Sequence, residues 1–119
     1  MIVYLACVFG ECKVVSLMVT PEAVAVATCE SGNRVDLGTY AMTARNTTTH
    51  DGGAWQFNDN TYLWLNGYTH AELDTPKNQY DTFEYLWDNG AGWRHWRASK
   101  ECWDKWLVID SKDNAVMRP

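Results

Sequence analysis

The chain has 119 residues, of which 46% are hydrophobic and 21% are charged. These values predict one globular domain with a single core and exclude a disordered protein. The formal net charge of -5 argues against a nucleic-acid-binding protein, because neutralising phosphates requires clustered Lys and Arg. No stretch approaches the roughly 20 apolar residues of a membrane-spanning helix, so we expect no membrane partner.

The first 19 residues are apolar but lack the basic start and the small-residue cleavage site of a signal peptide. Glu11 and Lys13 interrupt the apolar run. The pattern predicts two short strand-like or irregular pieces packed on the body of the domain, with β-branched residues gathered at 14–19. We treat residues 1–19 as an N-terminal extension of unknown role, with a degenerate export signal as the alternative.

The first predicted helix has Thr20 as its N-cap and Pro21 at its first position. It is expected to end at about Ser31, where Gly32 or Asn33 would adopt the left-handed conformation that stops a helix.

Residues 34–54 contain a run of three Thr and an Asp-Gly-Gly sequence, which is typical of hairpin turns with weak β character. Asn58 and Asp59 form a capping pair for a short helix over residues 61–65, which an Asn-Gly pair ends.

Thr75 and Pro76 repeat the cap-and-proline pattern, and the helix after them is expected to end near Gly90. Its apolar side contains Tyr80, Phe83, Leu86 and Trp87, and its other side is charged.

Residues 90–98 are expected to form a loop, after which Ser99 caps a last helix. That helix carries Trp103, Trp106 and Leu107 on one face, which we expect to be buried. Residues 110–119 are predicted to be a flexible tail. The whole chain, 1–119, is therefore predicted to be one α+β domain that is mostly helical.

Four cysteines, an even number, allow 3 pairings in a chain of this length. There is no Cys-x-x-Cys spacing and the three histidines are scattered, so we expect no zinc or other metal site. One or two disulfides, and hence an oxidising location, are the better interpretation.

Glu30 lies at the end of the first predicted helix, on the same stripe as Ala23, Val26 and Ala27. That stripe is expected to face the core. Burial and the negative end of the helix dipole both raise the pKa of a carboxyl group. A carboxylic acid that stays protonated near neutral pH is what a general acid requires. The alternative is an exposed Glu in a frayed last turn.

The motifs "CESGN" and "DGGAWQFNDNTY", followed by "TPKNQYDTFEYLWDNGAGWRHW", resemble the lysozyme-like superfamily of peptidoglycan glycosidases. That superfamily includes chicken-type lysozymes, lytic transglycosylases and resuscitation-promoting-factor-like domains of actinobacteria and their phages. The resemblance covers about residues 20–106. It implies a lysozyme-like fold with a small β-hairpin region beside the catalytic cleft.

The same resemblance implies that Glu30 is the catalytic acid. In the resuscitation-factor group a Cys before this Glu pairs with one near the C-terminus, which implies a disulfide between Cys29 and Cys102. Cys7 and Cys12 are then left as a local pair or as two free thiols.

Asp51 matches the position of the second carboxylate in chicken-type lysozymes, which favours hydrolysis. A retaining glycosidase places this carboxylate about 5 to 5.5 Å from the acid, and an inverting one about 6.5 to 9.5 Å from it. The alternative is a turn residue, since Asp-Gly is a common hairpin turn. Asp36 is a weaker candidate, and His50 is expected to be a surface residue beside Asp51.

Gln56 and Asn58 are expected to bind the N-acetyl groups or hydroxyls of the sugar, or to cap the next helix. Tyr62 and Trp64 either offer stacking faces to the sugar or belong to the core. Of Trp93 and Trp96, one is expected in the core and one, which we take to be Trp93, beside the substrate. Trp103 and Trp106 are both assigned to the core.

The resemblance predicts a muramidase that hydrolyses the β-1,4 bond between N-acetylmuramic acid and N-acetylglucosamine in bacterial cell walls. The alternatives are a lytic transglycosylase on the same fold and a non-catalytic module that binds wall glycans. We expect no cofactor, a monomer, and peptidoglycan glycan strands as the partner. The expected location is extracellular or the cell wall, or the enzyme is a phage lysin or virion component.

Overall fold

The computed structural model describes residues 2–32 and 42–119, and these form an α+β fold that is mostly helical, as predicted. The helices within these ranges are α1 (Pro21–Ser31), α3 (Asp59–Asn66), η1 (Ala71–Leu73), α4 (Pro76–Trp87), η2 (Asp88–Gly90), η3 (Trp93–Ser99) and α5 (Lys100–Trp103). The strands are β1 (Ile2–Val8), β2 (Glu11–Leu17), β3 (Arg45–Asn46), β4 (Asp51–Gly52), β5 (Phe57–Asn58), β6 (Leu107–Ile109) and β7 (Ala115–Met117). They pair as three small antiparallel sheets, β1-β2, β3-β4-β5 and β6-β7.

The predicted caps of α1 are confirmed. The Thr20 hydroxyl accepts a hydrogen bond from the Ala23 amide at 3.2 Å, and Pro21 occupies the first turn. Gly32 has φ of 79° and its amide donates to the carbonyl of Thr28, which ends the helix. The N-cap of α4 is also confirmed, because the Thr75 hydroxyl accepts a hydrogen bond from the Asn78 amide at 3.1 Å.

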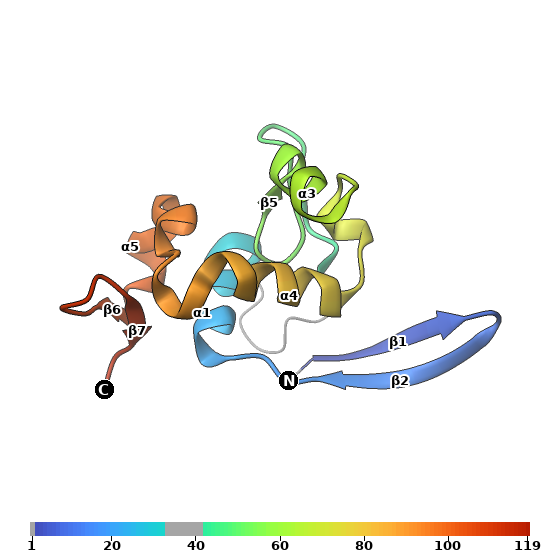
Figure 1. The fold of residues 1–119 in the computed structure, drawn as a ribbon, viewed down its shortest axis with the longest axis horizontal. Helices are drawn as coiled ribbons and strands as arrows, with labels where there is room; N and C mark the ends of the chain where they lie inside the picture. Colours follow the sequence, from blue (N-terminus) through green and yellow to red (C-terminus); the bar gives the residue numbers. More distant parts are fainter. Residues whose placement is uncertain (1, 33–41) are drawn as a thin grey trace.

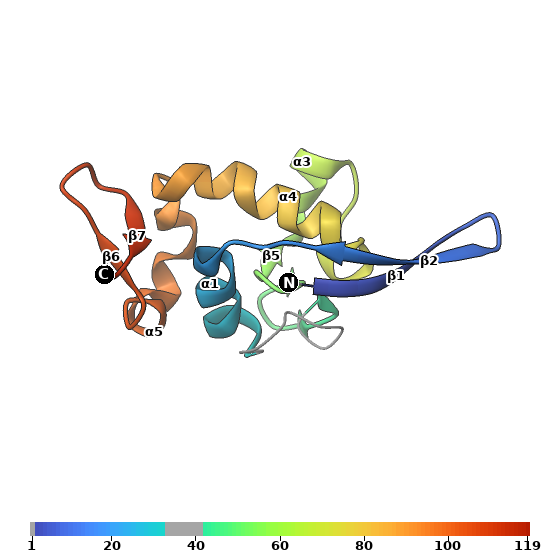
Figure 2. The ribbon, with the colours of Figure 1, turned by 90° about the horizontal axis from the view of Figure 1, so that it is seen from below.

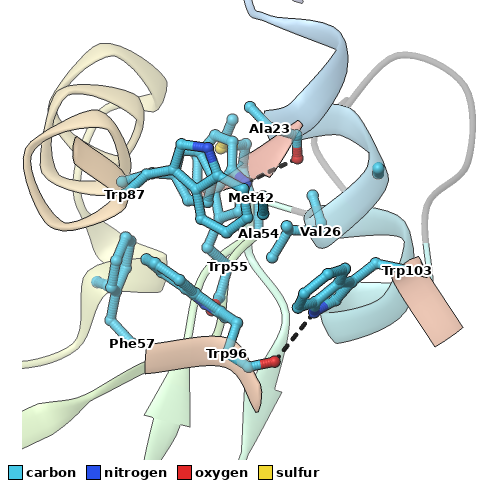
Figure 3. Packing of buried hydrophobic residues seen from close by; sticks show 14 of the residues in the cluster. Ala23, Val26, Met42, Ala54, Trp55, Phe57, Trp87, Trp96 and Trp103 are labelled. Atoms are coloured by element: carbon cyan, nitrogen blue, oxygen red, sulfur yellow. Dashed lines mark hydrogen bonds between the residues drawn. The ribbon is translucent and has the colours of Figure 1, made fainter. Parts of the chain in front are cut away.

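The core is built around Trp55, which lies between α1 and α4 (Figure 3). Its indole N–H donates to the Ala23 carbonyl of α1 at 2.9 Å, and its ring stacks on Phe83 of α4 with centroids 5.1 Å apart. The indole N–H of Trp96 donates to the Trp55 carbonyl, and that of Trp103 donates to the Trp96 carbonyl. Each of these three indoles thus meets a backbone acceptor, so the core fixes α1, η3 and α5 relative to one another.

A buried amide joins the start of the β3-β4-β5 sheet to α4. The side chain of Gln79 accepts from the Ala54 amide at 3.1 Å and donates to the Met42 carbonyl at 3.0 Å. A Cβ at Gly53, where φ is 84°, would lie 2.3 Å from the Gln79 oxygen. Only glycine therefore allows this close approach, which sets where the small sheet sits on the helices.

The N-terminal extension is a long β-hairpin that projects from the body of the molecule (Figures 1 and 2). Its base is anchored by Ile2, which is buried, while Phe9 at its tip is fully exposed. Phe9 and Gly10 both have positive φ, which suits a two-residue turn, and a disulfide joins Cys7 to Cys12 beside it. The two predicted strand-like pieces are confirmed, but they pack on the body only at the base of the hairpin, and its distal half projects away from it.

The C-terminal residues form the β6-β7 hairpin, so the predicted flexible tail is wrong. Ala115 is buried, and its carbonyl lies 2.3 Å from where a Cβ of Gly90 would be. The predicted last helix is reduced to the single turn of α5, and Leu107 lies in β6. Trp103 is buried as predicted, but Trp106 is 40% exposed, so its assignment to the core is wrong. Residues 90–98 were expected to form a loop, but most of them, from Trp93 on, are helical in η3.

Candidate active site

Glu30 lies in the last turn of α1, where it is partly buried. The hydroxyl of Ser99, at the end of η3, donates a hydrogen bond to Glu30 Oε1 at 2.7 Å. The predicted disulfide between Cys29 and Cys102 is present, with Cα atoms 5.8 Å apart. It joins α1 to α5 one residue before Glu30, so the carboxyl group and its hydrogen-bond donor are held on one rigid unit.

The pKa of Glu30 is raised above the ordinary value of a glutamate. Burial is the main cause, because it disfavours the charged carboxylate. The hydrogen bond from Ser99 acts in the opposite direction by stabilising the anion, and the negative charge of Asp51 raises the pKa further. The net effect is a carboxyl group that holds its proton to higher pH than a solvent-exposed one, as a general acid must.

Asp51 lies in β4 at the centre of the three-stranded sheet, where it is half-buried. It pairs with Asn46 of β3 and Asn58 of β5, and side chains of directly opposed residues share one face of a sheet. The turn in this hairpin lies at residues 47–50, so the interpretation of Asp51 as a turn residue is wrong. Asp51 instead lies opposite two asparagines in the sheet, and its negative charge acts on Glu30.

The side-chain amides of Asn46 and Asn58, the residues opposite Asp51, are both hydrogen-bonded to backbone amides. Asn58 caps α3 by accepting from the Asn60 amide at 3.0 Å, so its predicted capping role is confirmed. Asn46 accepts from the amides of Thr48 and Thr49 and closes the turn. The substrate-binding role of Asn58 stays a prediction, and it would use the amide nitrogen that the cap leaves over.

Gln56 supports the turn that leads into β5. Its φ is 51°, and its side-chain nitrogen donates to the carbonyls of Gly53 at 2.9 Å and Ala44 at 3.4 Å. These bonds tie the turn to the segment before β3. The predicted contact of Gln56 with the sugar stays a prediction.

The predicted stacking role of Tyr62 is wrong. Its ring is fully buried against Phe57, with centroids 5.4 Å apart, and its hydroxyl donates to Asp74 at 2.5 Å. No face of Tyr62 is left for a sugar, so its alternative as a core residue is confirmed. Trp64 on the same helix is 80% exposed, and it lines a groove with α4 rather than packing in the core.

Trp96 is the core member of its pair, and Trp93 is the more exposed one. The Trp93 ring packs edge-on against Trp103, and its N–H donates to the Asp113 carbonyl of the C-terminal hairpin. The guanidinium of Arg94 covers its ring at 4.5 Å from the centroid. These contacts tie Trp93 to the hairpin, and its contact with substrate stays a prediction.

His50 and Asp36 are the two remaining residues that the sequence singled out near the site. His50 is exposed in the turn before Asp51, as predicted for a surface histidine. Asp36 lies outside the residues that the structure describes.

Ser99 is the residue of the site that sequence reasoning missed. It was expected to cap the last helix, but its side chain makes no cap hydrogen bond there and turns to Glu30 instead. The signal lay in the cysteines: Glu30 follows Cys29, and Ser99 precedes Cys102 by one helical turn. A disulfide between those cysteines brings both side chains to the same place.

A partly buried charge cluster joins the small sheet to α3 and η1. Arg45 of β3 makes a two-pronged salt bridge to Asp59 of α3 and contacts Glu72 at 3.3 Å. The hydrogen bonds from Arg45 lower the pKa of Asp59 to about 2. Glu72 also lies against Gly52, where any Cβ would clash with its carboxylate. This ion pair therefore orients the strand that carries Asp51.

Within residues 2–32 and 42–119, no group of three or more His, Cys, Asp and Glu side chains could hold a metal ion. In the same part of the chain no helix is long and apolar enough to cross a membrane. Comparisons with protein-family models, curated proteins and solved structures find no match to this chain.

Proposed function

We propose that this protein is a lysozyme-like muramidase that hydrolyses the β-1,4 bond between N-acetylmuramic acid and N-acetylglucosamine in peptidoglycan. One observation carries the proposal: Glu30 is partly buried at the end of α1, and its pKa is raised by burial and by the charge of Asp51. A glycosidase uses one carboxyl group to donate a proton to the leaving oxygen and a second to stabilise the sugar ring or activate water, and the raised pKa of Glu30 suits the first role.

The chemistry follows from these two groups. Glu30 donates its proton to the glycosidic oxygen, the bond from that oxygen to the anomeric carbon breaks, and positive charge develops on the sugar ring. The carboxylate of Asp51 stabilises or captures that ring. Water then adds to the anomeric carbon and returns a proton to Glu30, which restores the starting state.

The sequence resemblance supports the same proposal. The cysteine before Glu30 and the one near the C-terminus are joined, as the resuscitation-factor pattern implies. The small β3-β4-β5 sheet comes directly after the segment that follows Glu30, which is the order found in lysozyme-like proteins. On this proposal the fold is lysozyme-like, with the sheet beside the cleft.

A lytic transglycosylase is the second candidate, and the hydrogen bond from Ser99 favours it. Of the two carboxylates, Glu30 is the one with a donor aimed at it. A mechanism in which the N-acetyl group of the substrate attacks the anomeric carbon needs this single acid. The non-catalytic glycan-binding module is the third candidate, in which the wall would be bound but not cut.

Mass spectrometry of purified peptidoglycan digested with the protein separates these candidates. The muramidase proposal predicts soluble fragments that end in reducing N-acetylmuramic acid and take up one oxygen from labelled water. Fragments with 1,6-anhydro ends would show that the reaction is transglycosylation and not hydrolysis. Binding to the wall without soluble fragments would leave the glycan-binding module.

The two disulfides suit an oxidising location, such as outside the cell or in the cell wall. A phage lysin or virion component that meets the wall from outside also fits. We propose a monomer that acts on glycan strands without a cofactor.

A further inference from the structure

A groove between α3 and α4 lies away from Glu30 and has two exposed aromatic walls. Its volume is about 420 Å³, within the range of about 300 to 1,000 Å³ usual for small-ligand sites. Trp64 of α3 is 80% exposed and Tyr85 of α4 is 70% exposed. The residues that line it are Trp64, Leu65, Asn66, Asn78, Asp81, Thr82 and Tyr85.

Fixed hydrogen bonds orient the polar groups between these two rings. The side-chain nitrogen of Asn66 donates to the Thr82 hydroxyl at 3.0 Å, and that hydroxyl donates to the Asn78 carbonyl. The side-chain nitrogen of Asn78 donates to Asp74 at 2.9 Å. These bonds use the side-chain nitrogens of both asparagines, so their amide oxygens are the groups that can accept from a ligand hydroxyl.

The charge of the groove narrows the ligand class. Asp81 is the one charged side chain among its described lining residues, and it pairs with Lys77 at 2.5 Å. A phosphate or sulfate would meet a carboxylate with no cation in the lining. A neutral ligand that has both an apolar face and several hydroxyls matches aromatic walls with amide and carboxylate acceptors between them.

The groove and Glu30 lie on different sides of α4. The face of α4 that contains Gln79 and Phe83 packs into the core above α1, while Asn78 and Tyr85 face the groove. Both views of the molecule place α3 and α1 on different sides of this helix (Figures 1 and 2). A ligand in the groove therefore does not touch the reacting carboxyl group.

We propose that the groove between α3 and α4 is a second glycan-binding site, in which Trp64 and Tyr85 stack on a pyranose ring. The amide oxygens of Asn66 and Asn78 accept hydrogen bonds from its hydroxyls. The identification of this ring as an N-acetylated sugar of the cell wall rests on the proposed function. The choice of a pyranose rests on the aromatic walls and amide acceptors of the groove. Such a site holds the protein on an insoluble glycan while Glu30 cuts.

Nuclear magnetic resonance titration of Glu30→Gln with N-acetylglucosamine tetramer tests the site directly. We expect shifts of the Trp64 indole N–H and of amides around Asn66 and Tyr85, and their loss in a Trp64→Ala/Tyr85→Ala variant. Leu73→Ala, which removes an equally exposed apolar side chain outside the groove, should keep them. Shifts confined to residues around Glu30 and Asp51, or no shifts at millimolar tetramer, would overturn the proposal.

A sedimentation assay with insoluble peptidoglycan measures the consequence. In the Glu30→Gln background, the Trp64→Ala/Tyr85→Ala change should weaken binding about tenfold, which corresponds to ~1.4 kcal/mol. Unchanged binding would contradict the inference. If cleavage fails in every variant but groove binding remains, the proposed function fails and the second site stands.

Discussion

The end of α1 and the groove between α3 and α4 hold their polar groups in opposite ways. Glu30 is partly buried, bonded to Ser99 and close enough to Asp51 to be affected by its charge. The groove instead exposes Trp64 and Tyr85 widely around oriented amides. Proton transfer needs a carboxyl group withdrawn from water, whereas holding a sugar needs accessible surface. One chain of 119 residues offers both environments on different sides of α4.

The largest expected effect is at Glu30. Glu30→Gln keeps an oxygen that accepts from Ser99 but removes the proton donor, so peptidoglycan cleavage should fall by about 10³-fold, within the range of about 10² to 10⁴ for general acids. Turnover measured as release of soluble fragments checks this. Glu101→Gln removes an exposed carboxylate on nearby α5 and should leave the rate unchanged. If the cleavage rate of Glu30→Gln falls by less than tenfold, Glu30 is not the general acid.

Removing the disulfide at the end of α1 should be the largest change in stability. Cys29 and Cys102 are 73 residues apart, so the chain-entropy model gives a loss of about 4 kcal/mol in the free energy of unfolding for Cys29→Ser/Cys102→Ser. Cys7 and Cys12 close a loop of only 5, for which the model gives about 2 kcal/mol.

Urea unfolding of the two double variants compares these losses. The first variant should also lose activity, because the Glu30 end of α1 is freed from α5. The second should keep activity, because the ribbon it loosens projects from the body. Equal losses of stability and activity would contradict the role given to the longer-range bridge.

Ser99→Ala should change the pH profile more than the maximal rate. The hydrogen bond from Ser99 lowers the pKa of Glu30, so its removal raises that pKa further. Glu30 then stays protonated to higher pH, so the alkaline limb of the pH–rate profile shifts to higher pH. Ser31→Ala, which removes a hydroxyl bonded to the Ala27 carbonyl in the same helix end, is the matched control. A downward or absent shift would show that Ser99 does not act on Glu30.

Glu30→Gln should also alter how stability depends on pH. The folded-state pKa of Glu30 is raised, so wild type loses stability as pH rises from the unfolded value through the folded one. The variant lacks this loss. Thermal unfolding should show a higher Tm for Glu30→Gln than for wild type near neutral pH, and no difference below about pH 4. A lower Tm at neutral pH would mean that the ionised carboxylate stabilises the fold.

The smallest expected effect concerns salt. With a net charge of -5, the protein should be repelled by anionic wall polymers, and added salt screens this repulsion. Activity on whole walls should therefore tolerate or increase with moderate salt. A steady fall from low to moderate ionic strength would contradict this account of the charge.

Local signals in the sequence predicted the helix ends well. The cap, proline and glycine around α1 each act within a few residues, so Thr20, Pro21 and Gly32 could be assigned from their neighbours. The burial of Glu30 also followed from its stripe on the helix. The link between Cys29 and Cys102 came from resemblance, since spacing alone leaves several pairings.

The failures involve contacts between distant segments. Ser99 reaches Glu30 across 69 residues, and the disulfide between Cys29 and Cys102 is what brings the two side chains together. The C-terminal hairpin packs Ala115 closely against Gly90, a contact between segments that the local sequence does not predict. Tyr62 and Trp64 are two residues apart and received the same two interpretations from the sequence. On the helix they lie on different faces, so Tyr62 is buried and Trp64 is exposed.

The most direct test of the central claim is the release of soluble fragments from purified peptidoglycan by wild type and Glu30→Gln side by side. Both proteins should sediment equally with the wall, since the groove between α3 and α4 is unchanged. Wild type should then release fragments and the variant essentially none. Equal release by both proteins, or none by either, would contradict the assignment of Glu30 as the proton donor of a wall-cleaving enzyme.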